Sequence, residues 1–282
     1  MNYRHGFHAG NFADVVKHAV FVRILAHLAL KPTPFRVIDT HAGEGVYDLR
    51  SAEAERTGEW REGIGRLARL SADDPAAVLL RPYREAVGPC DAQGRPPAYP
   101  GSPALARRLM RDQDRAIFCE TRVDAFSALR RRFARDRRIK TLEIDAYKGL
   151  NAFTPPPERR GVVLIDPPFE AQDECDRMRA AFAAAYRKWP TGIYALWYPI
   201  KDARARLLPD SLAAAGATKL LALDCAIDAA DTARAGLARA GLIVVNPPYT
   251  LEAETRVMLP ALVGAMERRP GAGAFAVIAR GR

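Results

Sequence analysis

The sequence predicts an α/β fold in which a mostly parallel sheet is covered by helices. Short apolar runs alternate with amphipathic segments along the chain, and this alternation is typical of strand–helix units. The expected strands lie at residues 35–40, 115–120, 140–145, 161–166 and 192–199. Amphipathic helices are expected at 122–136 and 172–189, and a late strand at 241–246 precedes a helix at 250–268.

Each of the first four expected strands ends on polar residues. These are Asp39 with Thr40, Glu120, Asp145 and Asp166. In open parallel sheets, ligands bind outside the carboxyl ends of the strands. The four acids therefore outline a ligand site at one edge of the sheet.

An insertion interrupts the strand–helix pattern. The chain has 282 residues, of which 49% are hydrophobic, enough for one large domain or two small ones. A ribose-binding acid usually follows a Gly-rich turn by about 20 residues, but Glu120 comes far later than Gly43 and Gly45. Residues 46–104, with helical polarity around 59–70 and 75–87, are therefore predicted to form a small helical subdomain within a main domain of residues 1–45 and 105–282.

The N-terminal segment carries many groups that can handle protons. The stretch "YRHGFHAGNFADVVKH" contains three histidines together with Tyr3, Arg4 and Lys17. Asn11 is a suitable N-cap for a helix beginning at Phe12, and the apolar residues after it keep a helical spacing. The segment is either a solvated leader before a core helix or a part of the active site. The clustering favours a contribution of residues 1–30 to the active site.

Composition excludes several classes of protein. The four cysteines are widely spaced without a CxxC pair, so neither a zinc site nor a redox dithiol is expected. No apolar run is long enough to cross a bilayer, and the polar first twenty residues are unlike a signal peptide. A cytoplasmic protein without metal or membrane is expected, and a monomer is the default because no oligomerisation surface is evident.

Charge points toward a polyanionic partner. The formal net charge is +10, which suits nucleic acid, although a basic composition also has other origins. The densest basic run comprises Arg130, Arg131, Arg132, Arg135, Arg137 and Arg138. Such a run is either a solvated helix face or a phosphate-binding surface with steep salt dependence. The sequence leaves both interpretations open.

The stretch "DTHAGEG" (39–45) predicts a close backbone approach to a ligand. Gly43 and Gly45 allow a tight turn after the first strand, although two glycines also suit an ordinary strand–helix turn. The acids on the next strands give the turn more weight. Glu120 can accept both ribose hydroxyls of an adenosine-containing cofactor, and Asp145 can accept its adenine amino group.

The stretch "VLIDPPF" (163–169) carries the expected chemistry. Asp166, Pro167, Pro168 and Phe169 resemble the (Asp/Asn/Ser)-Pro-Pro-(Tyr/Phe) motif of methyltransferases that act on exocyclic amino nitrogens. The lone pair of such a nitrogen is delocalised into its ring, and acceptors on its N–H groups localise it. The Asp166 carboxylate and the Pro167 carbonyl would supply these acceptors, and Phe169 would stack on a base turned out of its helix or loop.

A second stretch, "VVNPPY" (244–249), is the rival on its letters alone. Topology argues against it, because a late strand such as 241–246 is usually antiparallel and its carboxyl end points to the opposite edge. Asn246 is therefore expected to be structural, stopping the strand before the following helix.

Together these motifs resemble the RlmJ family of ribosomal large-subunit RNA adenine-N6 methyltransferases. The resemblance is carried by "YRHGFHAGNFADVVKH", "DTHAGEG", "ERTGE", "YPGSP", "LIDPPF", "GIYALWYP" and "NPPY", and it spans nearly the whole chain. It implies a Rossmann-like class I methyltransferase sheet that uses S-adenosylmethionine, with the inserted helical subdomain. It also implies methylation of one adenine of 23S rRNA, on naked RNA or an assembly intermediate.

The resemblance also implies roles for individual residues. The implied cofactor contacts are His18, His41, Gly43, Ser102, Glu120, Asp145, Ala146 and Asp166. Tyr3 would meet the RNA, and His5 and Lys17 would complete the active site, with Asp166 as proton acceptor. Two positions depart from the family: Phe169 stands where Tyr is frequent, and Ala146 stands where Gly is common.

Two other functions fit parts of the sequence. A DNA adenine-N6 methyltransferase would use the same motifs, but no large target-recognition domain is present beyond the insertion. A catalytically inactive RNA-binding assembly factor could keep the scaffold, but the complete Asp166-Pro-Pro-Phe169 motif argues against it.

Overall fold

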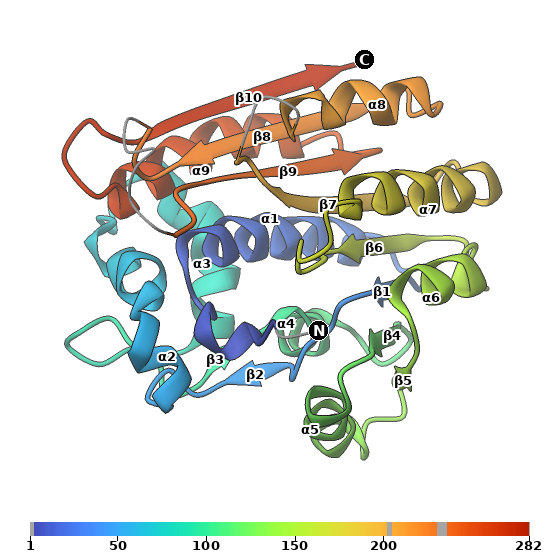
Figure 1. Cartoon of the computed structure of the whole chain (residues 1–282), viewed down its shortest axis with the longest axis horizontal. Coiled ribbons are helices and arrows are strands. Elements are labelled where there is room, and N and C mark those ends of the chain that lie inside the picture. The colour runs from blue at the N-terminus through green and yellow to red at the C-terminus, as the bar shows by residue number, and fades with distance from the viewer. Residues whose placement is uncertain (1–2, 202–204, 230–235, 282) are drawn as a thin grey trace.

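The computed structural model describes residues 3–201, 205–229 and 236–281 (Figure 1). Within these residues, the main sheet has eight strands in the order β10-β8-β9-β7-β6-β1-β4-β5. The strands are β1 (Arg36–Asp39), β4 (Arg115–Glu120), β5 (Ile139–Glu143), β6 (Gly161–Ile165), β7 (Ile193–Pro199), β8 (Leu220–Ala226), β9 (Arg239–Val245) and β10 (Ala274–Arg280). The five strands from β5 to β7 in this order are parallel, which confirms the mostly parallel sheet. The sequence did not predict β8 and β10.

Helices cover both faces of this sheet, and the alternation along β6 shows how. Val162 and Leu164 pack on one face, whereas Val163 and Ile165 pack on the other, as the period of two in a strand requires. The first face is covered by α1 (Phe12–Ala29), α3 (Pro75–Val87), α4 (Ser102–Leu109), α5 (Val123–Phe133) and α9 (Leu251–Met266). The second is covered by α6 (Ala146–Phe153), α7 (Glu174–Lys188) and α8 (Leu208–Ala214). None of the helices in the described ranges is long and apolar enough to cross a membrane.

Helix α1 is buried on nearly all sides. Asn11 caps it as predicted, accepting a hydrogen bond from the backbone N–H of Asp14 at 2.9 Å. The burial extends beyond the face that the apolar spacing indicates, because even the charged side chains of Asp14 and Lys17 are buried. The helix lies between the sheet and the segment 46–104, so both sides are covered (Figure 1).

The segment 46–104 begins and ends in a small antiparallel pair, β2 (Val46–Tyr47) with β3 (Tyr99–Pro100). Between them lie α2 (Ala52–Thr57), the 3-10 helices η2 (Glu59–Glu62) and η3 (Ile64–Arg69), and α3. Trp60, Leu80 and Tyr83 of this segment are fully buried in the same core cluster as α1. The segment therefore shares its core with the rest of the chain.

The two Pro-Pro stretches lie at opposite edges of the sheet. β6 pairs with β1 in parallel, so Asp166 emerges beside the end of β1, as predicted. β9 is antiparallel to both β7 and β8, so Asn246 emerges at the other edge. There its side-chain amide donates to the carbonyls of Pro190 and Gly192, both at 2.8 Å. This geometry supports the structural interpretation of Asn246.

We predict that Asn246→Ala lowers the free energy of unfolding by about 1–3 kcal/mol. The substitution removes two hydrogen bonds and places alanine at a φ of 52°, which asparagine tolerates better. Urea denaturation measures the change. Asn246→Gly is the matched control, because it loses the same hydrogen bonds without the backbone penalty. Its free energy of unfolding should lie between those of the wild type and Asn246→Ala. Wild-type stability of Asn246→Ala would contradict the assignment.

Candidate functional site

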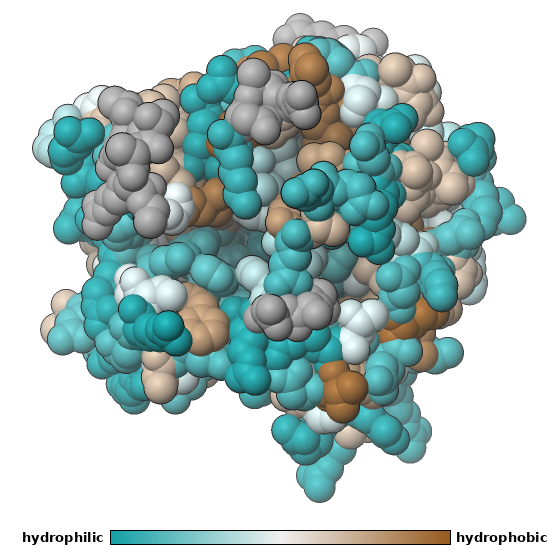
Figure 2. All heavy atoms as spheres, in the orientation of Figure 1, coloured by the Kyte–Doolittle hydropathy of each residue, from teal (hydrophilic) through white to brown (hydrophobic). Residues whose placement is uncertain are grey.

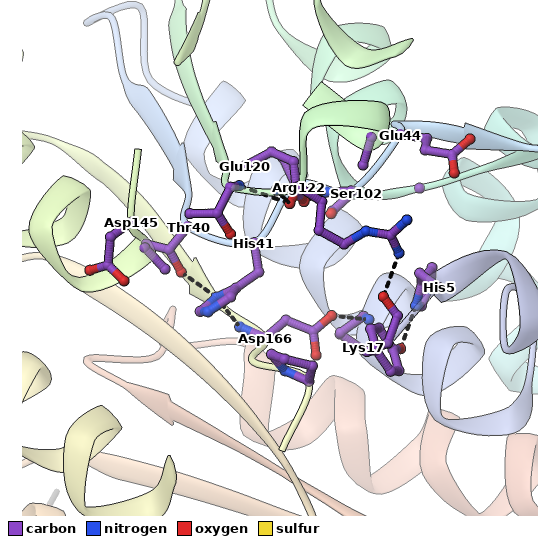
Figure 3. A pocket seen from close by; sticks show the side chains of 18 of the residues that line it. His5, Lys17, Thr40, His41, Glu44, Ser102, Glu120, Arg122, Asp145 and Asp166 are labelled. Atoms are coloured by element: carbon purple, nitrogen blue, oxygen red, sulfur yellow. Dashed lines mark hydrogen bonds and ion pairs between the residues drawn. The ribbon is translucent and has the colours of Figure 1, made fainter. Parts of the chain in front are cut away.

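A cleft opens at the carboxyl ends of the parallel strands (Figure 3). Thr40 to Gly43 follow β1, Glu120 ends β4, Asp145 follows β5 and Asp166 follows β6. Every one of these residues lines the cleft, so the strand ends converge on one cavity, whereas Asp39, the predicted acid at the end of β1, does not line it. The eight residues predicted to contact a cofactor all lie in this lining: His18, His41, Gly43, Ser102, Glu120, Asp145, Ala146 and Asp166.

Gly43 and Glu120 form one wall of the cleft. The backbone N–H of Gly43 donates to Oε2 of Glu120 at 2.9 Å, and Oε1 accepts from the backbone N–H groups of Thr121 and Arg122. Gly43 has a φ of 60°, and a Cβ atom there would lie 2.1 Å from the Tyr47 hydroxyl oxygen. These bonds hold the carboxylate in place, and each of its oxygens retains acceptor capacity for a ligand.

Asp145 presents one free oxygen to the cleft. It is the N-cap of α6, and its Oδ1 accepts from the backbone N–H groups of Tyr147 and Lys148 at 3.1 and 3.0 Å. Its Oδ2 accepts no hydrogen bond from the residues that the structure describes. Ala146 follows as the first residue of the helix. The cap thus fixes the carboxylate and leaves its second oxygen available as an acceptor.

Asp39 is a buried acid beneath the cleft. Its side chain accepts from the Ser102 hydroxyl at 2.6 Å and from the His41 backbone N–H at 3.1 Å. Burial raises the pKa of Asp39 to about 7, although these two donors favour the ionised form. Asp39 therefore connects the start of α4 with the turn after β1.

A chain of charged groups joins the N-terminal segment to Asp166. Lys17 donates from Nζ to Asp14 Oδ1 at 2.7 Å and to Asp166 Oδ2 at 2.5 Å. Asp14 Oδ2 lies 3.0 Å from Nε2 of His5, whose Nδ1 lies 2.8 Å from the Tyr3 hydroxyl. The structure thus brings together Tyr3, His5, Lys17 and Asp166, the residues that the family resemblance places in one active site.

The charged groups around Lys17 stabilise one another in their ionised forms. Burial would raise the pKa of Asp14, but His5 and Lys17 hold it well below its usual range. Burial would lower the pKa of Lys17, but Asp14 and Asp166 raise it above the ordinary value for lysine. The Lys17 side chain is only 4% exposed, so the ammonium depends on its two carboxylates.

Two histidines of the cleft are neutral near pH 7. Burial lowers the pKa of His18 to about 3 and that of His41 to about 4. The Nδ1 atom of His41 meets the Thr40 hydroxyl at 2.8 Å and the backbone N–H of Asp166 at 3.3 Å. The His41 ring thereby links the turn after β1 to the end of β6.

A second, larger cavity of about 760 Å³ adjoins the first. The two share Tyr3, His5, Lys17, Asp166 and Pro168 in their linings, so Asp166 stands where they meet.

Phe169 lines only the second cavity, packing edge to face on Trp197 at 5.8 Å between ring centroids. Its φ of 51° is uncommon for an aromatic residue and typical of functional turns. Pro167 is buried and lines neither cavity, whereas Pro168 lines both.

Several polar residues of the site were not predicted from the sequence, and two of them, Asp14 and Arg122, hold the N-terminal segment in place. Asp14 joins His5 to Lys17, but its spacing of three residues before Lys17 also suits an exposed helix pair. Arg122 donates to the backbone carbonyl of Tyr3 and so ties the N-terminal segment to the end of β4 (Figure 3). Its place two residues after Glu120 was the available signal.

The basic run lies on α5 and the turn after it. Arg130, Arg131 and Arg132 are exposed, whereas Arg138 pairs with Asp136 at 2.7 Å. Hydrophilic side chains dominate the face shown in Figure 2, with hydrophobic residues scattered among them. The run stays open to either interpretation, because it does not line the two cavities.

The family model and the curated relatives that match this sequence are all described as ribosomal RNA large-subunit methyltransferases. The family model described as "Ribosomal RNA large subunit methyltransferase D, RlmJ" matches residues 32–277. The chain is 41% identical over 264 residues to "Ribosomal RNA large subunit methyltransferase J" of Escherichia coli (strain K12), covering 93% of this chain and 92% of that protein. The Haemophilus influenzae protein of the same name is 39% identical with the same coverage. A crystal structure of a Legionella pneumophila protein matches with a TM-score of 0.86 at 30% identity, over 97% of this chain and 98% of that one.

We predict that Asp14→Asn lowers the free energy of unfolding by about 3 kcal/mol, because it leaves the buried Lys17 with one carboxylate instead of two. Urea denaturation at neutral pH measures this change. Asp176→Asn is the matched control, since its ion pair with Arg179 is exposed and should contribute less than about 1 kcal/mol. Equal effects of the two substitutions would argue against a buried charge chain.

A pH dependence follows from Asp39. The folded protein keeps the Asp39 proton up to about pH 7, whereas the unfolded chain releases it near 3.8, so Asp39 makes folding less favourable as pH rises between these values. In the absence of ligand, the stability of Asp39→Asn relative to wild type should therefore increase from about pH 4 to about pH 7. Unfolding curves across this range measure it. Asp136→Asn is the control, since the pKa of Asp136 is lowered and its contribution should change little above about pH 5.

Proposed function

The chain belongs to the RlmJ family of ribosomal RNA large-subunit methyltransferases, and we propose that it methylates the exocyclic N6 amino group of one adenine in 23S rRNA. Family membership makes it an S-adenosylmethionine-dependent ribosomal RNA methyltransferase. The observation that carries the finer proposal is the position of Asp166 between the two cavities. The first cavity would take the cofactor and the second the target nucleotide, on naked RNA or an assembly intermediate.

The residues of the first cavity suit S-adenosylmethionine. Glu120 retains acceptor capacity for the two ribose hydroxyls, and the free Oδ2 of Asp145 suits the adenine amino group. The φ of Gly43 lets the backbone approach the ligand closely. The remaining contacts of this proposal are His18, His41, Ser102, Ala146 and Asp166. When bound, the cofactor supplies an electrophilic methyl group on its sulfonium.

Asp166 would localise the lone pair of the target nitrogen. Lys17 occupies Oδ2 of Asp166, which leaves Oδ1 as acceptor for an amine N–H. The fixed orientation gives the positioning that such a reaction requires, and Asp166 would accept the proton released from nitrogen.

The backbone carbonyl of Pro167 would accept the second N–H of the target amine. Pro167 lines neither cavity in this structure, so the Pro-Pro turn would have to present that carbonyl when RNA binds.

The N-terminal segment and Phe169 would hold the target base. Tyr3 lines both cavities, and its ring stacks on His8 with an interplanar angle of 9°. Phe169 exposes an aromatic surface in the second cavity, where base stacking contributes about 1–3 kcal/mol per base. Tyr3, His5 and Lys17 are held through Asp14, so substrate contacts and the Asp166 carboxylate share one rigid support.

The proposal extends to the organisation of the chain. Residues 46–104 form an inserted helical subdomain of a Rossmann-like domain made of 1–45 and 105–282, and the antiparallel pairing of β2 with β3 supports these limits. The protein acts as a monomer in the cytoplasm, where its ribosomal RNA substrate is found.

We predict that the protein transfers labelled methyl groups to protein-free 23S rRNA that lacks its own modifications, and that digestion yields N6-methyladenosine. Asp166→Ala should reduce the rate by about 10²–10⁴-fold, because it removes the acceptor at the target nitrogen. The controls are Asp173→Ala, an exposed acid of the same loop, and Asn246→Ala at the opposite edge. Both should retain activity in the folded protein.

The outcomes separate the alternatives. Methylation of duplex DNA instead of rRNA would keep the mechanism and overturn the substrate. Cofactor binding without transfer to either would indicate an inactive RNA-binding factor. Loss of activity with Asn246→Ala but not with Asp166→Ala would show that the other Pro-Pro stretch carries the reaction.

A further inference from the structure

Three buried side chains form a hydrogen-bonded chain behind the cofactor cleft. Nδ1 of His18 lies 2.9 Å from the Tyr99 hydroxyl, which lies 3.0 Å from the Tyr83 hydroxyl. His18 is 1% exposed, and both tyrosines are 0% exposed. His18 belongs to α1 and lines the cleft, whereas Tyr83 and Tyr99 belong to the segment 46–104. These hydrogen bonds therefore connect the segment 46–104 to the cofactor cleft.

Neutral His18 carries a proton on only one of its two ring nitrogens. Because it is neutral, one ring nitrogen donates and the other accepts, and the partner of one nitrogen determines the state of the other. Nδ1 is engaged by Tyr99, and Nε2 has no hydrogen-bond partner among the described residues. The direction of the Tyr99 bond consequently decides what His18 presents to the cleft.

Counting hydrogens distinguishes the two directions. If Tyr83 donates to Tyr99 and Tyr99 donates to Nδ1, every hydroxyl hydrogen in the chain has an acceptor. If Nδ1–H donates to Tyr99 instead, three hydrogens, the Nδ1 hydrogen and the two hydroxyl hydrogens, share only two hydrogen-bond contacts. One of the two hydroxyl hydrogens is then buried without an acceptor among the described residues, whichever tyrosine donates to the other. A buried donor without a partner is costly, so the first direction is favoured.

We propose that Tyr99 holds His18 in the tautomer protonated on Nε2, so that His18 presents an N–H donor to the carboxylate of S-adenosylmethionine. This inference rests on the proposed cofactor site. The opposite tautomer would present a lone pair, which repels a carboxylate. Tyr99 is thus a positioning residue that acts through His18, and it gives the insertion a part in cofactor binding.

The tautomer can be measured directly by NMR on protein labelled with ¹⁵N-histidine. The chain has five histidines, and the signal that disappears in His18→Gln identifies His18. The wild type without cofactor should show His18 protonated on Nε2 at neutral pH. Protonation on Nδ1 would overturn the proposal, and this reading needs no variant of either tyrosine to fold.

Two matched variants test the role of the hydroxyls. Tyr99→Phe removes the donor to Nδ1, so His18 should populate both tautomers and the Kd for S-adenosylmethionine should rise about tenfold. Tyr83→Phe removes an equally buried hydroxyl from the same chain, but Tyr99 can still donate to Nδ1. It should therefore keep the tautomer and change the Kd less than about threefold. Isothermal titration calorimetry measures both constants.

The results also separate this proposal from the proposed function. An unchanged tautomer and unchanged Kd in a folded Tyr99→Phe protein would overturn the positioning role. Equal losses in Tyr99→Phe and Tyr83→Phe with an unchanged tautomer would also overturn it, because they would show a purely structural effect. Absence of methyl transfer by a wild type that binds the cofactor with His18 protonated on Nε2 would count against the proposed function alone.

Discussion

The buried bridge of Lys17 between Asp14 and Asp166 is the interaction on which the site depends. A buried ammonium is costly unless carboxylates surround it, and here one comes from α1 and the other from the end of β6. The bridge therefore specifies how the N-terminal helix sits against the sheet. Through His5, the same charges orient Tyr3 at the junction of the two cavities. The Lys17 bridge consequently both stabilises the packing of α1 and fixes the position of the Asp166 carboxylate.

Strand direction decides which of two similar motifs can react. Both Asp166 and Asn246 follow apolar strands and precede two prolines. β6 runs parallel to β1 and delivers Asp166 to the cleft, whereas β9 runs antiparallel and delivers Asn246 to the far edge. The local conformations differ accordingly. At Asp166 the unusual backbone falls on Phe169, whose ring lines a cavity, and at Asn246 it falls on an amide that binds the carbonyls of Pro190 and Gly192.

The inserted segment is more than an attachment to the sheet. Its apolar side chains complete the core around α1, which explains why a helix near the chain start can be buried on both sides. Its Tyr99 hydroxyl meets His18 at the back of the cleft, and Tyr83 hydrogen-bonds to Tyr99 behind it. A neutral histidine in a buried site must have its single proton directed by a neighbour, and the insertion provides that neighbour. Core packing and ligand chemistry are therefore coupled in the same segment.

The sequence by itself determined the parallel strands, the acids at their ends, the Asn11 cap and the motifs at Gly43 and Asp166, because these depend on local periodicity and on backbone preferences. It missed β8 and β10, although both are mostly apolar runs. Pro168 lines both cavities and Pro167 neither, which the sequence did not predict, since the direction of each residue after a strand depends on the turn. Asp14 escaped notice because a carboxylate three residues before a lysine suits any exposed helix. Only the tertiary structure decided that this pair is buried, since burial depends on what packs over the helix, and that information is spread across the whole chain.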